Sequence, residues 1–181
     1  MPNAILDPTG RTTGGPAGTA AQTAPRRPDL RGATVGLLTN TKQNAALFLE
    51  ELGRLLVDRH GVGEVVAVTK TAFAQPVPEE MLKELVARCD AVVTGVGDFG
   101  SCSASAVTDG VAFERRGTPA AVICSDAFRG SADAIAELRG APGYQYVTTV
   151  HPVAVLTPGE VRERAEAALA EVVSLLVAGE G

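Results

Sequence analysis

The chain has 181 residues, of which 45% are hydrophobic but only 4% aromatic, so we expect one domain with a core of Val, Leu, Ala and Ile. Its net charge of −5 combines charges of both signs, which argues against a nucleic-acid-binding surface. No apolar run approaches the roughly 20 residues of a membrane span, and no basic-then-apolar leader is present, so we expect a cytoplasmic protein. The 3 cysteines suggest no disulfide framework and fit reduced thiols.

Residues 1–30 are rich in Pro, Gly, Thr and Ala and show no hydrophobic period. We therefore predict a flexible N-terminal tail over residues 1–30 and a single domain over residues 31–181. The stretch Ile5–Gly10 is an exception, because two apolar residues precede a turn signal there. It is a candidate for docking on the domain or on a partner chain.

From residue 35 onward, short apolar runs alternate with stretches of helical period. We predict strands at Val35–Leu38, Val65–Val68, Ala91–Val93, Ala120–Ile123 and Tyr146–Val150. We predict helices at about 41–60, 79–88, 101–116, 126–138 and 158–177. Asn40 or Thr41 is expected to cap the first helix and Gly61 to end it. Thr157 and Glu160 form the pattern of a capping box for the last helix.

Five apolar strands that alternate with five helices predict an α/β fold in which both faces of the sheet are covered. We expect three αβα layers with a mainly parallel sheet, in the flavodoxin-like or Rossmann-like order 2-1-3-4-5. The loops that follow strands one, three, four and five then share one edge of the sheet. Ligands bind at that edge in open α/β sheets, so we predict the site there.

The predicted site edge carries a glycine-rich loop. Gly95-x-Gly97-x-x-Gly100 follows a strand and opens a helix, as the dinucleotide-binding fingerprint does, and Asp126 ends the next strand. Two features oppose a nicotinamide or flavin site: Asp98 places a negative charge in the loop, and the fingerprint normally follows the first strand. The alternative is a turn whose glycines serve backbone geometry only.

Cys102 lies at the predicted start of a helix, where unpaired N–H groups and the helix dipole favour a thiolate. It is therefore a candidate nucleophile, with Asp98 partly opposing the effect. The alternative is a small residue packed in a tight loop. Cys89 and Cys124 lie within or beside apolar strands and are expected in the core.

His151 and Lys42 are the other candidate chemical groups at this edge. His151 precedes a proline at a strand end and is either a general base or part of a turn. Lys42 either fixes a substrate carboxylate or phosphate or is a solvated lysine. No ligand spacing supports a metal site from Cys102, His151 and Asp126, so we predict no metal and no cofactor.

A series of short motifs in order resembles the UGSC-type (seleno)protein family, whose motif is selenocysteine or cysteine followed by Gly-Ser-Cys. The matching residues are Leu6–Gly10, Val35–Leu38 with Asn40, Lys42 and Asn44, Cys89-Asp90, Gly95-x-Gly97-Asp98, Gly100–Cys102, Glu114–Gly117 with Pro119, and His151-Pro152. The resemblance implies candidate site residues at Cys102, Asp98, Asn40, Lys42, Asp109 and His151. It also implies a cupped site at the carboxyl edge of the sheet.

The chain departs from that family pattern at two positions. Phe99 stands where the family has selenocysteine or cysteine, and Thr108 stands before Asp109 where members tend to have His. A dithiol or selenenyl-sulfide pair needs two chalcogens, so the first departure excludes redox chemistry through this motif.

We therefore expect a small enzyme, in specialised metabolism, that performs non-redox chemistry on a small acidic or acyl metabolite. The predicted catalytic residues are Cys102, His151 and Asp98. The predicted substrate-binding residues are Asn40, Lys42, Phe99, Ser101, Ser103, Asp109 and Asp126. One alternative is a weakly catalytic subunit that pairs with a related chain, with a homodimer also open, and another is a nucleotide-dependent oxidoreductase.

Overall fold

The computed structural model describes residues 24–72 and 74–179. Its five strands form one parallel sheet in the order β2-β1-β3-β4-β5. The strands are β1 (Thr34–Thr39), β2 (Glu64–Thr69), β3 (Ala91–Gly97), β4 (Ala120–Ser125) and β5 (Val147–Thr149). The helices are α1 (Ala45–His60), α2 (Glu79–Arg88), α3 (Gly100–Arg115), α4 (Arg129–Leu138) and α5 (Pro158–Leu176). The predicted fold class and strand order are confirmed.

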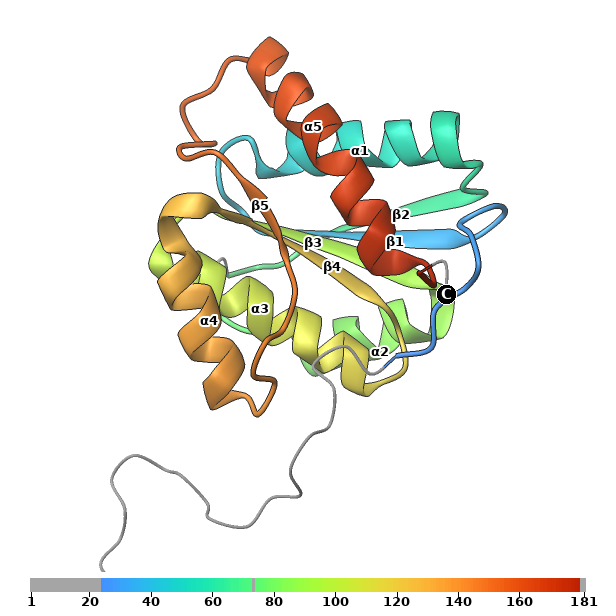
Figure 1. Cartoon of the computed structure of the whole chain (residues 1–181), viewed down its shortest axis with the longest axis horizontal. Helices are drawn as coiled ribbons and strands as arrows, with labels where there is room; N and C mark the ends of the chain where they lie inside the picture. The colour runs from blue at the N-terminus through green and yellow to red at the C-terminus, as the bar shows by residue number, and fades with distance from the viewer. Residues whose placement is uncertain (1–23, 73, 180–181) are drawn as a thin grey trace, which may run out of the picture.

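The helices cover both faces of the sheet, as the apolar strands predicted. Figure 1 shows α1 and α5 on one face and α2, α3 and α4 on the other. Each face has its own apolar core: Phe48 of α1 and Leu169 of α5 lie in the first, whereas Val107 of α3 and Leu85 of α2 lie in two clusters on the second. In residues 24–72 and 74–179, no helix has the length and apolar character to cross a membrane.

β3 lies at the centre of the sheet, and all seven of its residues are buried. Its two glycines permit unusually close packing. A Cβ at Gly97 would stand 2.7 Å from the Cα of Ser103 in α3, and a Cβ at Gly95 would stand 2.9 Å from the carbonyl oxygen of Ile123. Because backbone atoms occupy that space, no larger residue fits without moving α3 or β4.

The start of α1 differs from its prediction. The helix begins at Ala45 after Asn44, which has a left-handed φ of 65°, and not after a cap at Asn40 or Thr41. The reason is that Asn40 already uses its side chain, which accepts from the N–H of Lys42 and donates to the carbonyl of Val96. The chain therefore makes one more turn before the helix. Its end at Gly61 is as predicted.

The last two helices follow their sequence signals with one correction. The predicted helix at 126–138 is divided into a 3-10 turn, Asp126–Phe128, and α4. The capping box before α5 is confirmed, because Thr157 accepts from the N–H of Glu160 while the Glu160 carboxylate accepts from the N–H of Thr157.

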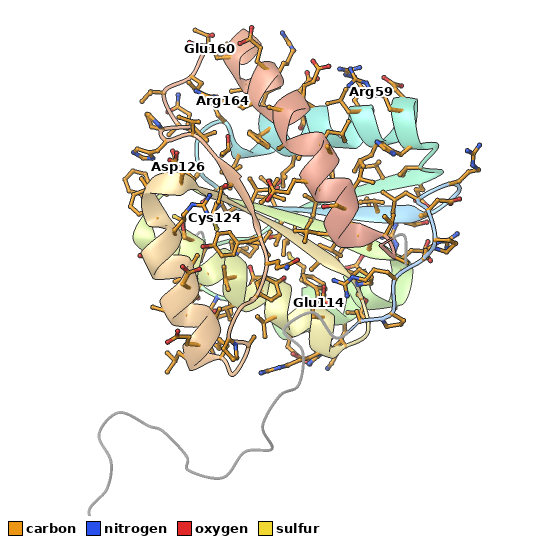
Figure 2. All side chains as sticks on the ribbon, in the orientation of Figure 1. Arg59, Glu114, Cys124, Asp126, Glu160 and Arg164 are labelled. Carbon is orange, nitrogen blue, oxygen red and sulfur yellow. The ribbon has the colours of Figure 1, made fainter. Side chains whose placement is uncertain are left out.

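Residues 24–30, which we predicted as part of a flexible tail, are packed against the domain. Residues 1–23 lie outside the described residues, but Ala24 and Leu30 are buried in the domain. The anchor is Glu114, whose fully buried carboxylate accepts from the N–H of Ala24 and from both terminal nitrogens of Arg26. It also accepts from the N–H of Ala120, and Figure 2 shows it on the α3 side of the sheet. No local pattern could indicate this pairing, because Arg26 and Glu114 lie 88 residues apart.

Replacing Glu114 with Ala should lower the free energy of unfolding by about 3 to 5 kcal/mol, because it leaves the Arg26 guanidinium and two backbone N–H groups without their acceptor. Urea denaturation measures the change. The matched control is Glu166→Ala, which removes a carboxylate from an exposed ion pair with Arg59 and should change stability little. Equal effects from the two variants would contradict the anchoring role.

Candidate functional site

The carboxyl ends of four strands meet at one edge of the sheet, here called the carboxyl rim. β1 brings Asn40 to it, β3 brings Asp98, β4 brings Ser125 and Asp126, and β5 brings His151. Figure 2 shows Asp126 at the point where β4 passes into the turn before α4. Parallel strands place their carboxyl ends together, so the sequence was sufficient to predict which loops meet.

The central interaction of the carboxyl rim joins Asp98 to His151. Nδ1 of His151 lies 2.9 Å from Oδ1 of Asp98, and the hydroxyl of Ser125 lies 3.4 Å from the same nitrogen while it donates to the carbonyl of Gly97. The Asp98 side chain is 3% exposed and that of His151 is 34% exposed. A buried carboxylate therefore supports a partly exposed imidazole.

The hydrogen bonds of Asp98 assign the imidazole tautomer. Its Oδ2 accepts from the N–H groups of Val153 and Ala154, both at 2.9 Å, as an ionised carboxylate does. This arrangement favours a hydrogen bond that Nδ1 of His151 donates to Oδ1, and a neutral ring in that tautomer has its lone pair on Nε2. Nε2 has no hydrogen-bond partner among the described residues. It is the atom that can accept a proton from a bound molecule.

The loop after His151 is held from two sides. Asp98 binds its N–H groups, and the side-chain amide of Asn44 donates to the carbonyls of Val153 and Leu156, both at 2.9 Å. Asp126 accepts from the backbone N–H of His151 at 3.0 Å. The orientation of the imidazole is therefore fixed by groups from α1, β3 and the turn after β4. Asp126, which we predicted to bind substrate, contributes here through the backbone of His151.

Lys42 and two aromatic rings extend the carboxyl rim beyond His151. The ammonium of Lys42 lies 4.5 Å from the centre of the Phe99 ring. The Phe99 and Phe128 rings are 6.0 Å apart, and Phe128 meets His151 edge to face at 5.2 Å. Phe128 was not among the predicted site residues, although an aromatic residue just after a strand end was a usable signal.

Cys102 differs most from its prediction. Its side chain is fully buried in the first turn of α3. Burial raises the pKa of the Cys102 thiol, and the opposing effects of Lys42 and of a hydrogen bond from Ser101 do not outweigh it. Removal from water therefore opposes the predicted stabilisation of a thiolate by the helix N-terminus. The position supports packing and not nucleophilic attack.

Three other predicted substrate-binding residues are buried and have partners within the protein. Asn40 joins the loop after β1 to β3, and the hydroxyl of Ser103 donates to the carbonyl of Gly97. Asp109 is fully buried and accepts from the ammonium of Lys70 at 2.5 Å and from the N–H of Val77 at 2.7 Å. Burial raises the pKa of Asp109, while Lys70 opposes the rise. These groups therefore serve contacts within the protein.

Lys70 is the buried residue that the sequence analysis missed. It follows β2 directly and also donates to Ser105 and to the carbonyl of Gln75, so it ties the loop after β2 to α3. A charged residue at the end of an apolar strand was the available signal. Its partner in α3 lies 39 residues away and could not be inferred from local pattern.

The glycines of the fingerprint have a structural explanation. Gly95 and Gly97 allow β3 to approach β4 and α3, as described above. Asp126, which a dinucleotide site would use for a ribose hydroxyl, is engaged with the N–H of His151. In the described part of the chain, no group of three His, Cys, Asp or Glu side chains is placed to hold a metal ion.

Two of the larger hollows of the described surface lie away from the carboxyl rim. One of about 430 Å³ is lined by Asp29, His60 and Val177 among others, and one of about 370 Å³ lies between α1 and β2. Neither contains a predicted site residue.

Comparisons with known proteins place the chain in a family without supplying an activity. The model of the UGSC family matches residues 4–178. No curated protein matches the chain. One solved structure, described as an ABC transporter permease from the Pseudomonas fluorescens group, is 16% identical with a TM-score of 0.42, covering 78% of this chain and 32% of that one. The chain thus spans about a third of that protein, and so low a similarity carries no argument about function.

Alkylation should distinguish a buried from a reactive Cys102. Because burial raises its thiol pKa, iodoacetamide at pH 7.5 should leave Cys102 unmodified in the folded protein and modify it rapidly in urea. Peptide mass spectrometry reads the modified site, and Cys124, which is also fully buried, is the internal control. Preferential modification of Cys102 in the folded protein would restore the predicted nucleophile.

Stability at alkaline pH should report the burial of Cys124. Burial raises its pKa from 9.0 to about 12, so its stabilising contribution is complete below pH 9 and is lost as the pH rises toward 12. Cys124→Ala cannot ionise, so its deficit relative to wild type should shrink by about 2 kcal/mol between pH 7.5 and pH 10.5. Urea denaturation at the two pH values measures this, and a constant deficit would contradict it.

Proposed function

This chain belongs to the UGSC family, and we propose that it is an enzyme performing non-redox acid–base chemistry on a small acidic metabolite at the carboxyl rim. The observation that carries the proposal is the Asp98–His151 pair, in which a buried carboxylate orients an accessible imidazole. In this pair His151 has the arrangement of a general base that is oriented by a second group, the Asp98 carboxylate. A cytoplasmic location and a place in specialised metabolism are parts of this proposal.

Two features support chemistry without redox steps. Phe99 stands in the motif position where the family has selenocysteine or cysteine, so the motif lacks its second chalcogen. All three cysteines are buried and free, and burial raises the thiol pKa of each. The groups of the carboxyl rim that we propose for the chemistry are therefore the His151 imidazole and the Lys42 ammonium.

The proposed step is a proton transfer through Nε2 of His151. A neutral imidazole accepts a proton from a C–H or O–H group of the metabolite, which becomes an anion, and the ring becomes an imidazolium. Asp98 stabilises that positive charge, and Lys42 stabilises the negative charge of the metabolite. The imidazolium then returns the proton to the product. In this scheme Cys102 supports the first turn of α3 instead of attacking the substrate.

A second candidate is a weakly catalytic subunit that pairs with a related chain bearing an intact motif. The presence of Phe99 in the motif favours it. Co-expression with such a chain, followed by size-exclusion chromatography, distinguishes a heteromer from a homodimer or a monomer. The nucleotide-dependent oxidoreductase stays a hypothesis without a supporting contact, and fluorescence titration with NADH, NADPH or FMN addresses it.

The tautomer of His151 provides a test that needs no substrate. Nitrogen-15 NMR of the full chain should find the neutral ring of His151 protonated on Nδ1, because Nδ1 faces the Asp98 carboxylate. In Asp98→Asn this preference should weaken. A ring protonated mainly on Nε2 in the wild-type protein would contradict the proposed base.

Deuterium incorporation from D2O into a panel of small carboxylic acids tests the proton transfer itself. Loss of a general base should lower the exchange rate of His151→Gln by a factor of about 10² to 10⁴. The matched control is His60→Gln, since His60 is the other of the 2 histidines and ends α1 away from the carboxyl rim. Wild-type exchange in His151→Gln would contradict the proposal.

A further inference from the structure

Several large apolar side chains are exposed at the carboxyl rim. Five large hydrophobic residues are exposed in the described part of the chain, and three of them belong to the loops of the carboxyl rim: Phe99 at 47%, Val150 at 49% and Val155 at 75%. Phe99 reaches His151 through Phe128, and the two valines lie near His151 in the sequence. Phe128 adds a second, partly buried ring beside them. Contiguous apolar surface bordered by charged groups is typical of a binding site.

The chemical groups follow one another in a defined order. The Lys42 ammonium contacts the Phe99 ring, the Phe99 ring contacts Phe128, and Phe128 contacts the His151 imidazole. Two aromatic rings therefore separate the positive charge from the base along this series of contacts. A ligand that lies along this series meets an apolar surface between the Lys42 ammonium and the His151 imidazole.

The geometry points to a flat, aromatic or conjugated carboxylic acid as the substrate, and we propose this class; the inference rests on the proposed function. The carboxylate binds the Lys42 ammonium, the flat body stacks on Phe99 and Phe128, and the end remote from the carboxylate lies at His151. Aromatic rings prefer offset or tilted contacts at about 4.5–7 Å. The Phe99 and Phe128 rings already make such a contact, and the ring of the ligand would add another. A short hydroxy or keto acid has no flat body that could stack on the two rings.

Binding of inert probes tests the class without requiring turnover. Sodium benzoate, sodium cyclohexanecarboxylate, sodium acetate and benzamide are titrated into the full chain and followed by NMR. Benzoate should bind about tenfold tighter than acetate, cyclohexanecarboxylate and benzamide, because only benzoate has both the flat ring and the negative charge. Equal affinity for benzoate and cyclohexanecarboxylate would overturn the aromatic part of the inference.

Variants assign each preference to its residue. In Lys42→Met the tighter binding of benzoate than of benzamide should disappear. The control is Lys83→Met, which changes an exposed lysine side chain on α2 and should keep the difference. In Phe99→Leu the advantage of benzoate over cyclohexanecarboxylate should disappear, whereas Leu138→Ala, which removes another exposed apolar side chain, should keep it. Unchanged preferences in Lys42→Met and Phe99→Leu would place the ligand elsewhere and overturn the proposal.

His151→Gln separates this inference from the proposed function. The variant should retain benzoate binding within about threefold, since the carboxylate and ring contacts lie at Lys42 and Phe99. If benzoate binds as expected but His151→Gln keeps wild-type exchange, the proposed function fails and the ligand class stands. If His151→Gln loses exchange but the wild-type protein shows no preference for benzoate, the function stands and the ligand class is wrong.

Discussion

The arrangement of the carboxyl rim depends on one buried carboxylate, that of Asp98 at the end of β3. It accepts from the imidazole of His151 and from the N–H groups of Val153 and Ala154. These contacts join the centre of the sheet to the chain that leaves its edge strand, β5. A buried carboxylate that loses its donors is strongly unfavourable, so the loop and the imidazole are held together by the same constraint. The orientation of His151 thus follows from the contacts that hold the loop after β5.

The fold could be predicted because its signals are local and repeated. Apolar strands such as Val65–Val68 and the helical period after Asn44 recur along the chain, and parallel strands oblige their carboxyl ends to meet. The same reasoning could name Asp98 and His151 as neighbours. It could not say which polar side chains face inward. Asp109 is buried because Lys70, 39 residues away, provides its charge partner, and no local pattern records that distance.

Cys102 shows how tertiary burial overrides a local rule. A helix N-terminus favours a thiolate, and Lys42 acts in the same direction, yet the side chain is fully enclosed and its pKa rises. The close approach of Gly97 to Ser103 brings the first turn of α3 against β3, which leaves little room for water around the neighbouring sulfur. The glycines that suggested a nucleotide loop and the cysteine that suggested a nucleophile thus have a common origin in tight packing between strand and helix.

Phe99 stands where the resemblance in sequence implies a chalcogen, and its ring gives that position a physical role of its own. A selenol or thiol beside Lys42 would be a nucleophile near a cation, whereas a phenyl ring there is an apolar surface on which the same cation rests. The ring also contacts Phe128, which in turn contacts His151, so the substitution extends an apolar path toward the imidazole. With the three thiols buried and this apolar surface exposed, the His151 imidazole is the group on which our proposal of acid–base chemistry rests.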